Sequence, residues 1–379
     1  MPAIHKKPDV KERLTILSRD SQYDLACACS SKDQSEHRHR SKDDRWIYPV
    51  ILPGNRKMFL LRTLISNVCS NDCKYCPLRS GQDLTRCSLS PEEAARVFFD
   101  YYGRHKISGL FLSSGVIGNP DRTMERLITT AAILRRQNFS GYIHLKIIPG
   151  ASDSAIEEAV SLSSAVSLNI ETPGKNHFER LSSNKDYIND IIRPIKLISG
   201  LTAKGGRFAK VKQTTQFVVG ASDETDREIV KYTWGLYRRL KFHRVYFSAY
   251  QRGLGESDLP GEKSALTNNE LLTREHRLYQ TDFLMRKYGF SDDEIPFSSD
   301  GNLSLETDPK EAWAKSNPGF FPVNINRADK FELLRVPGLG HVTVDQILEL
   351  RKSGGRIRSM DSLGKLNKRF IKASEYVRF

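Results

Sequence analysis

The sequence predicts an α/β fold in which short buried strands alternate with amphipathic helices. From Met58 onwards, apolar runs of strand length recur along the chain, and segments with helical periodicity separate them. This alternation is typical of a parallel sheet, wound either open or as a partial barrel. The composition changes again at Phe321, which indicates a separate C-terminal module. The six expected strands are 58–65, 108–113, 142–148, 165–170, 211–219 and 243–249.

Helices are expected between these strands at 90–104, 121–137, 152–161, 186–204 and 224–240. Pro91 suits a first helical turn, and Asp121 and Asp223 are suitable N-caps. Sheets of this kind place their chemistry at the carboxyl ends of the strands. The loops that follow the strands are therefore where a site is expected.

The chain divides into four predicted regions. An N-terminal extension, 1–57, combines a helix-like start with a polar run, and the alternating core follows at 58–255. Residues 256–320 are rich in polar residues and glycine around one helical stretch, 269–288, and are interpreted as an elaboration and linker. The module at 321–379 completes the chain.

Composition favours a globular enzyme over a fibrous or disordered chain, with 39% hydrophobic and 27% charged residues among 379. No apolar run approaches the roughly 20 residues that span a bilayer. The N-terminus has no signal-peptide core, so a cytoplasmic location without a membrane partner is expected. The formal charge of +14 favours a polyanionic partner, with nucleic acid as the first candidate. Residues 321–379 carry 12 Lys and Arg against 6 Asp and Glu, a net charge of 12 − 6 = +6.

Four of the six cysteines fall close together, which favours metal ligation over disulfides. Cys69, Cys73 and Cys76 follow the first strand directly, in a loop short enough to place three thiolates around one inorganic centre. Thiolates select zinc or iron–sulfur clusters. A cubane cluster on three cysteines leaves one iron open, whereas structural zinc wants a fourth ligand, for which Cys87 or His105 could serve.

The spacing Cys69-x3-Cys73-x2-Cys76, with Tyr75 before the last cysteine, resembles the signature of the radical S-adenosylmethionine (SAM) superfamily. The resemblance implies a partial (β/α)6 TIM-like barrel and a [4Fe-4S] cluster on these cysteines. It further implies that the open iron binds SAM, and that an electron from a flavodoxin or ferredoxin cleaves SAM to a 5′-deoxyadenosyl radical. Tyr75 would then pack near the adenine.

Polar segments at later strand ends are similar to further SAM-binding elements of that superfamily. The contacts that the resemblance implies are Ser113, Ser114 and Gly115 after the second strand, Asn169 and Glu171 after the fourth, Val218 and Gly220 at the fifth, and Tyr250 after the sixth. The segment at Ser113 departs from the superfamily pattern because it lacks the usual glutamate, so backbone carbonyls and hydroxyls would have to accept hydrogen bonds there.

The C-terminal module resembles a helix-hairpin-helix, a small all-α domain. Two short helices flank a Pro-Gly-Leu-Gly hairpin that can present backbone N–H groups to a phosphate oxygen whatever the base sequence. The candidate DNA contacts are Arg335, Gly338, Gly340, His341, Thr343 and Lys352. The alternative is that the hairpin packs internally or binds another protein.

Together with the N-terminal Tyr23-Asp24 stretch and Cys27 and Cys29, these parts resemble a family of DNA modification or repair radical SAM proteins linked to uracil-DNA glycosylases. The resemblance implies a radical enzyme that repairs or modifies DNA, with a uracil-DNA glycosylase-like protein as a further partner. Two alternatives stay open: an enzyme that modifies RNA, such as a tRNA base, and a non-enzymatic, metal-stabilised DNA-binding protein.

A radical left on a base must be quenched, and thiols are good hydrogen-atom donors. Cys87, Cys27 and Cys29 are the candidates outside the triad, and Tyr250 comes next. The alternative is that these cysteines are packing residues or incidental thiols.

Overall fold

The computed structural model describes residues 8–24, 47–51, 57–104 and 106–379, which form two compact units. The first takes in the described residues up to Glu224 together with Gly235–Leu272, and the second consists of Thr225–Trp234 and Thr273–Phe379. Residues 273–320, which the sequence suggested as elaboration and linker, thus pack in one unit with the C-terminal module. In the described ranges, no helix has the length and apolar character needed to cross a membrane.

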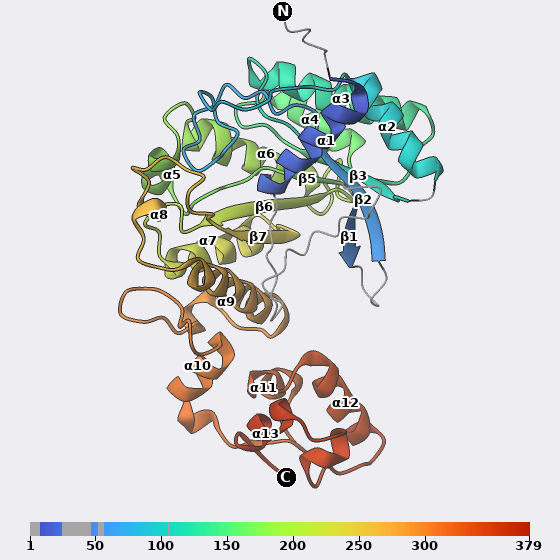
Figure 1. Cartoon of the computed structure of the whole chain (residues 1–379). Helices are drawn as coiled ribbons and strands as arrows, with labels where there is room; N and C mark the ends of the chain where they lie inside the picture. The colour runs from blue at the N-terminus through green and yellow to red at the C-terminus, as the bar shows by residue number, and fades with distance from the viewer. Residues whose placement is uncertain (1–7, 25–46, 52–56, 105) are drawn as a thin grey trace, which may run out of the picture. The chain divides into compact units, whose positions relative to one another are not determined.

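The first unit is built on a curled, open half-barrel sheet whose strands lie in chain order (Figure 1). The strands β2 to β7 are mutually parallel, as predicted. An additional strand, β1, pairs antiparallel with β2 and places Ile47 opposite Leu61, within the segment expected to be an N-terminal extension. The strands are β1 (Ile47–Ile51), β2 (Lys57–Leu64), β3 (Gly109–Ser113), β4 (Tyr142–Lys146), β5 (Ala165–Ser167), β6 (Lys212–Val219) and β7 (Arg244–Ala249).

Helices connect the parallel strands, which confirms the alternation read from the sequence. The expected helices are α2 (Pro91–Gly103), α3 (Pro120–Arg136), α4 (Asp153–Leu162), α6 (Arg193–Thr202) and α7 (Asp226–Arg239). A π-helical segment, Tyr187–Ile192, forms the start of the predicted helix 186–204. α1 (Val10–Asp20) precedes the sheet, and the short helices α5 (Lys175–Leu181) and α8 (Pro260–Lys263) were not predicted.

Two predicted helix caps are corrected by the structure. The N-cap of α3 is Asn119, whose side chain accepts the Arg122 N–H at 2.8 Å, while Asp121 lies in the first turn. Asp223 does not cap α7; its carboxylate binds His177 and Arg180 instead. Asn119 and Asp121 are both good capping residues, so the prediction failed by position and not by chemistry.

The second unit joins two helices to the C-terminal module. Its helices are α9 (Asn268–Lys287), which begins five residues before this unit, α10 (Pro309–Ser316), α11 (Lys330–Arg335), α12 (His341–Lys352) and α13 (Lys368–Ser374). A two-stranded parallel sheet, β8 (Val323–Asn324) with β9 (Val377–Arg378), ties the start of the module to its end. The module is therefore not purely helical, which corrects the all-α expectation. The core of the second unit includes Trp313, whose ring lies 5.4 Å from that of Phe290 and 5.3 Å from that of Phe320.

A buried ion pair stabilises the second unit. Asp226 accepts the Arg274 Nε–H at 2.7 Å and the Leu303 N–H at 2.9 Å, and its side chain is 1% exposed. We expect Asp226→Asn to lower the free energy of unfolding by about 3–5 kcal/mol, because it leaves the guanidinium buried without its counter-charge. Urea denaturation measures the loss.

The matched control is Asp345→Asn, which breaks the exposed ion pair between Lys330 and Asp345. It should cost less than about 1 kcal/mol, since water already solvates both charges. Equal losses in the two variants would contradict the assignment of Asp226 as a stabilising buried charge.

Candidate functional site

The three cysteines lie in the loop between β2 and α2, at the carboxyl end of the sheet. The Cys76 N–H donates to the Cys73 carbonyl at 2.8 Å, and the Ser70 N–H donates to the Val116 carbonyl in the loop after β3 at 2.9 Å. The charge of Cys73 and that of Cys69 both raise the pKa of Cys76, so the three sulfur atoms lie within electrostatic reach of one another. The sequence spacing and the fold therefore bring the thiols together.

Arg86 holds the shape of this loop, which we call the cysteine loop (residues 65–90). Its guanidinium donates to four carbonyl oxygens of the loop, those of Asn67, Leu78, Arg79 and Gln82. The backbone carbonyl oxygens of a loop that are removed from water need hydrogen-bond donors. The Arg86 guanidinium supplies donors to four of them. Arg86 therefore fixes part of the shape of the cysteine loop.

Asp72, between the first two cysteines, fastens this loop to the segment that follows α5. Its carboxylate accepts the Ser183 N–H at 2.8 Å and the hydroxyls of Ser182 and Ser183. Burial alone would raise the pKa of Asp72, but the hydrogen bonds from these serines lower it to about 2. The Lys74 N–H also donates to the Leu181 carbonyl at 2.8 Å, so two contacts join the segments.

This attachment places Lys185 beside the cysteines. Its ammonium group lies near the Cys73 sulfur, Glu171 and Cys69. Burial lowers the pKa of Lys185, but Cys73, Glu171 and Cys69 outweigh that effect and raise it overall. Desolvation raises the pKa of Cys76 to about 12 and raises that of Cys73 as well. A lysine side chain therefore lies beside the cysteines, and the sequence motifs do not reveal it.

Glu171 lies beside two other predicted SAM contacts, Tyr75 and Asn169. The Asn169 side-chain amide donates to its carboxylate at 3.4 Å. Burial and then the charge of Glu171 raise the pKa of Tyr75, so these two side chains lie close together. Glu171 is 6% exposed and has a left-handed backbone with φ of 63°. A non-glycine residue in that region is strained by about 1–3 kcal/mol, and such strain clusters at functional sites. Tyr75, Asn169 and Glu171 thus lie close to one another and to Lys185, while their contact with SAM stays a prediction.

The loop after β3 passes directly over the cysteine loop at Gly115. A Cβ atom there would lie 2.4 Å from the Val68 carbonyl oxygen and 3.2 Å from the Cys69 Cβ, so only glycine permits this approach. The Gly115 N–H donates to the Ser66 carbonyl at 2.8 Å, and the Ser114 hydroxyl donates to the Gly115 carbonyl. The structure therefore places Gly115 against the first cysteine, with Ser113 and Ser114 directly before it in the chain.

Of the remaining predicted SAM contacts in the described part of the chain, Val218 and Tyr250 lie close to Tyr75, and no contact of Gly220 with that ring is seen. Val218 and Tyr250 belong to one apolar cluster against which Tyr75 packs. The Gly220 N–H donates to the Glu224 carboxylate at 2.5 Å, and the Tyr250 hydroxyl donates to Glu262. Residues from the ends of β2, β5, β6 and β7 thus enclose the Tyr75 ring.

The loop after β7 is attached to the cysteine loop across the open edge of the half-barrel. Arg79 donates to the Leu254 carbonyl at 3.0 Å and forms an ion pair with Glu256 at 3.3 Å. The Glu256 N–H donates to the Lys74 carbonyl at 3.0 Å, and Lys74 pairs with Asp258. The loops of the first and the last parallel strand are therefore fastened together at the site, a feature that had not been predicted.

Cys87 lies under α1. Its backbone N–H donates to the Asn67 side chain at 2.7 Å, and its sulfur donates to the Arg13 carbonyl at 3.8 Å. Burial, with a smaller effect of Asp20, raises the pKa of the Cys87 thiol to about 11. Cys27, Cys29 and His105 lie outside the described residues. The side chains of Tyr23 and Asp24 lie outside the described part as well. The hydrogen-donor role of these cysteines stays a prediction.

Within the described ranges, no three His, Cys, Asp or Glu side chains converge on a point where one metal ion could sit. The assignment of Cys69, Cys73 and Cys76 as metal ligands stays a prediction from their spacing.

Two of the predicted DNA contacts have partners within the second unit. Arg335 forms an ion pair with Glu294 at 2.7 Å and lies over the rings of Phe290 and Trp313, at 4.4 and 4.8 Å. Gly338, with φ of 85°, would place a Cβ 2.2 Å from the Arg369 carbonyl oxygen. Both residues therefore hold the module together, and their contact with DNA stays untested.

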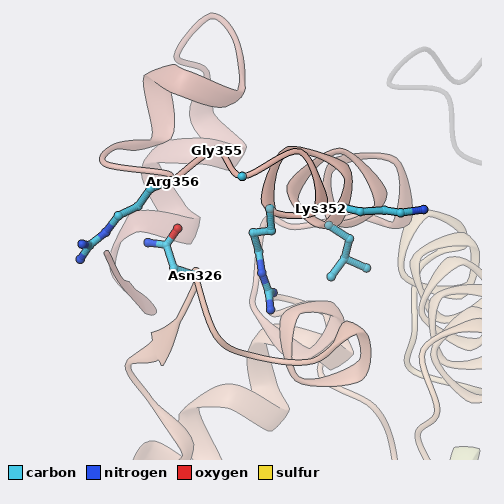
Figure 2. A pocket seen from close by; sticks show the side chains of 7 residues that line it. Asn326, Lys352, Gly355 and Arg356 are labelled. Atoms are coloured by element: carbon cyan, nitrogen blue, oxygen red, sulfur yellow. The ribbon is translucent and has the colours of Figure 1, made fainter.

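A cavity of about 540 Å³ opens at the end of α12 (Figure 2). Its lining includes Asn326, Arg351, Lys352 and Arg356. Arg351 donates to the Ala328 carbonyl at 2.6 Å. Figure 2 shows Lys352 and Arg356 on opposite sides with their side chains pointing away from each other, so they do not face one ligand.

No curated protein matches the chain. Solved structures that resemble it include HydG from Carboxydothermus hydrogenoformans, an FeFe-hydrogenase maturase, with 15% identity, 60% of this chain and 51% of HydG covered, and a TM-score of 0.44. Methylornithine synthase (PylB) shares 16% identity over 59% of this chain and 63% of its own, with a TM-score of 0.43. The cobalamin-dependent S-adenosylmethionine radical enzyme OxsB shares 12% identity over 78% of this chain and 45% of its own, with a TM-score of 0.37. The chain spans about half the length of these proteins, between 45% and 63%.

Residues 321–372 match the helix-hairpin-helix motif family. They contain α11, α12 and α13, and the glycine-containing turn between α11 and α12 lies where the sequence placed the hairpin. The C-terminal module of this chain therefore contains a helix-hairpin-helix motif.

Proposed function

We propose that this protein is a radical SAM enzyme that binds a [4Fe-4S] cluster through Cys69, Cys73 and Cys76 and acts on DNA. The observation that carries the proposal is the gathering of three thiols in one loop, beside a lysine and a buried carboxylate. The carboxylate is that of Glu171, which follows β5, and the lysine is Lys185, in the loop that follows α5. An α-amino acid carries the complementary pair of charges: its carboxylate could pair with Lys185 and its ammonium group with Glu171.

The residues around the triad fit SAM as the ligand of the open iron. Lys185 would bind the carboxylate of its methionine part, because a charge-assisted hydrogen bond favours that pairing. Glu171 and the carbonyl groups near Ser114 would accept from the ammonium group or the ribose hydroxyls, with Asn169 beside them. Tyr75, Val218 and Tyr250 would enclose the adenine. When bound, the cluster supplies one electron that cleaves the sulfonium of SAM and releases a 5′-deoxyadenosyl radical.

The chain's own groups would exclude water from that step. The contacts of Lys74 and Arg79 with the loop after β7 cover one side of the cysteine loop. The electron would come from a flavodoxin or ferredoxin, and a uracil-DNA glycosylase-like protein is a proposed further partner. Cytoplasmic location remains part of the proposal.

DNA is proposed as the substrate because the helix-hairpin-helix motif lies in a segment with a net charge of +6 (12 Lys and Arg against 6 Asp and Glu in 321–379). A base inside a duplex would have to be turned out to reach the strand ends of the sheet. RNA, such as tRNA, is the second candidate, since the same charge would attract it.

The decisive experiment combines oxygen-free purification, iron and sulfide analysis, and an assay for 5′-deoxyadenosine with and without DNA. Iron and sulfide at four per chain with 5′-deoxyadenosine formation support the enzyme. Zinc in place of iron without 5′-deoxyadenosine would support the non-enzymatic DNA-binding alternative. Competition between duplex DNA and tRNA separates the two substrates.

DNA binding by the full chain should be independent of sequence and should weaken steeply with salt. For about four phosphate contacts, the affinity is expected to fall roughly 100-fold between 50 and 200 mM salt, because bound counterions are released on binding. Fluorescence anisotropy with duplexes of different sequence measures both properties. An affinity that salt leaves unchanged would contradict a phosphate-based contact.

A further inference from the structure

The first hairpin of the module, Val336–Gly340, is covered by the chain itself. Val336 and Leu339 are 0% and 1% exposed. The ammonium group of Lys310, from α10, donates to the Leu339 carbonyl at 2.5 Å and lies 4.8 Å from the centre of the Tyr288 ring. Lys310 is itself 8% exposed, and burial lowers its pKa to about 7. This hairpin is therefore anchored by a buried lysine.

Tyr288 covers the end of the same hairpin. A Cβ at Gly340, the last residue of the hairpin, would lie 3.5 Å from the Tyr288 hydroxyl oxygen. Tyr288 is itself buried, with 7% of its surface exposed. A phosphate oxygen that approached this end of the hairpin would therefore meet the Tyr288 phenol.

A second turn of the module, between its 3-10 helix Met360–Leu363 and α13, is open instead. Six successive residues, 364–369, are exposed, and three of them are the cations Lys365, Lys368 and Arg369. Leu366 lies among them with 48% of its surface exposed. This contrast with the buried first hairpin indicates which turn faces a partner.

Two more exposed cations, Arg356 and Arg358, stand on either side of the buried Ile357. Residues 356–369 therefore carry five cations against one carboxylate, Asp361, a net of 5 − 1 = +4. None of these five side chains forms an ion pair with a carboxylate in the described part of the chain. We call residues 356–369 the basic segment.

We infer that the basic segment, and not the first hairpin, binds the sugar–phosphate backbone of duplex DNA. The inference rests on the proposed DNA-binding function. It assigns the contact with DNA to the basic segment instead of the first hairpin. Unpaired Lys and Arg side chains release counterions when phosphates replace them, which drives binding whatever the sequence. The first hairpin then serves to fix the module on α10 through Lys310 and Tyr288.

The test is the double variant Lys365→Glu/Lys368→Glu in the full, cluster-loaded chain, measured by fluorescence anisotropy with a fluorescein-labelled 20-base-pair duplex. We expect the affinity to fall about 10- to 100-fold and the slope of log affinity against log salt to become less negative by about 2, or 0.9 for each lost contact. Lys365→Arg/Lys368→Arg should keep the original affinity and slope.

The matched control, Lys204→Glu/Lys210→Glu, makes the same change of net charge at two exposed lysines of the first unit. It should leave the slope unchanged. Tyr288→Phe, which removes the hydroxyl beside Gly340, should leave the DNA affinity unchanged as well. Tighter binding by Tyr288→Phe would show that the first hairpin is the contact and would overturn the inference.

Binding by Lys365→Glu/Lys368→Glu with the original affinity and slope would overturn the inference and leave the proposed function intact. No DNA binding by the unaltered chain would overturn both. Displacement of the duplex by tRNA at equal or lower nucleotide concentration would overturn the assignment of duplex DNA as the partner.

Discussion

Replacing Cys69, Cys73 or Cys76 with alanine is expected to abolish the cluster and the formation of 5′-deoxyadenosine. Two thiolates hold a cubane poorly, because each cysteine binds its own iron atom. The protein reconstituted without oxygen should show a broad visible absorption that each of the three variants lacks. Iron and sulfide analysis gives the stoichiometry.

Cys87→Ala is the matched control for these variants. Its sulfur contacts the Arg13 carbonyl under α1, so the variant should keep the full iron and sulfide content and the absorption band. A complete cluster in any of the three triad variants would contradict the assignment of these cysteines as ligands. Loss of the cluster in Cys87→Ala would make Cys87 a ligand and favour a four-cysteine site.

Lys185→Met is expected to weaken SAM binding by about 10- to 100-fold while iron content stays unchanged. A hydrogen bond to a charged partner contributes about 1.5–3 kcal/mol, and methionine keeps the length of the side chain without its charge. Equilibrium dialysis of the cluster-loaded protein with labelled SAM measures the affinity. Lys185→Arg should restore most of it.

A lysine outside the site provides the comparison. Lys175→Met removes a charge that pairs with Glu179 on the surface of α5 and should leave the SAM affinity as it is. Unchanged affinity in Lys185→Met would show that Lys185 only balances the cysteine thiolates. Loss of iron in that variant would point to the same conclusion.

The sheet could be predicted because each parallel strand is an apolar run flanked by helical segments. The boundaries of β2 and β6 lie within one residue of the predicted ones. β1 gave no such signal: it is an edge strand with Pro49 inside it, a residue that is depleted in strands and tolerated only at edges. The start of helix 186–204 is π-helical, which periodicity of 3.6 residues does not predict.

The site was predictable where chemistry and spacing coincide. The cysteines, Tyr75 and Glu171 stand in short motifs at strand ends, and the structure brings them together. Lys185 could not be found this way, because it lies in a loop 109 residues beyond Cys76 and reaches Cys73 only through the contacts of Asp72 with Ser182 and Ser183. The burial of the first hairpin was hidden for a similar reason: Lys310 comes from a segment whose composition suggested a linker.

The bonds that Arg86 makes to four carbonyls of the cysteine loop separate the folding of that loop from its metal chemistry. In zinc fingers the metal supplies the folding free energy, so the empty peptide is unfolded. Here the Arg86 guanidinium and the Asp72 carboxylate add bonds of the polypeptide itself to the loop that carries the cysteines. Part of the stability of this loop therefore comes from the chain, whatever its cysteines bind.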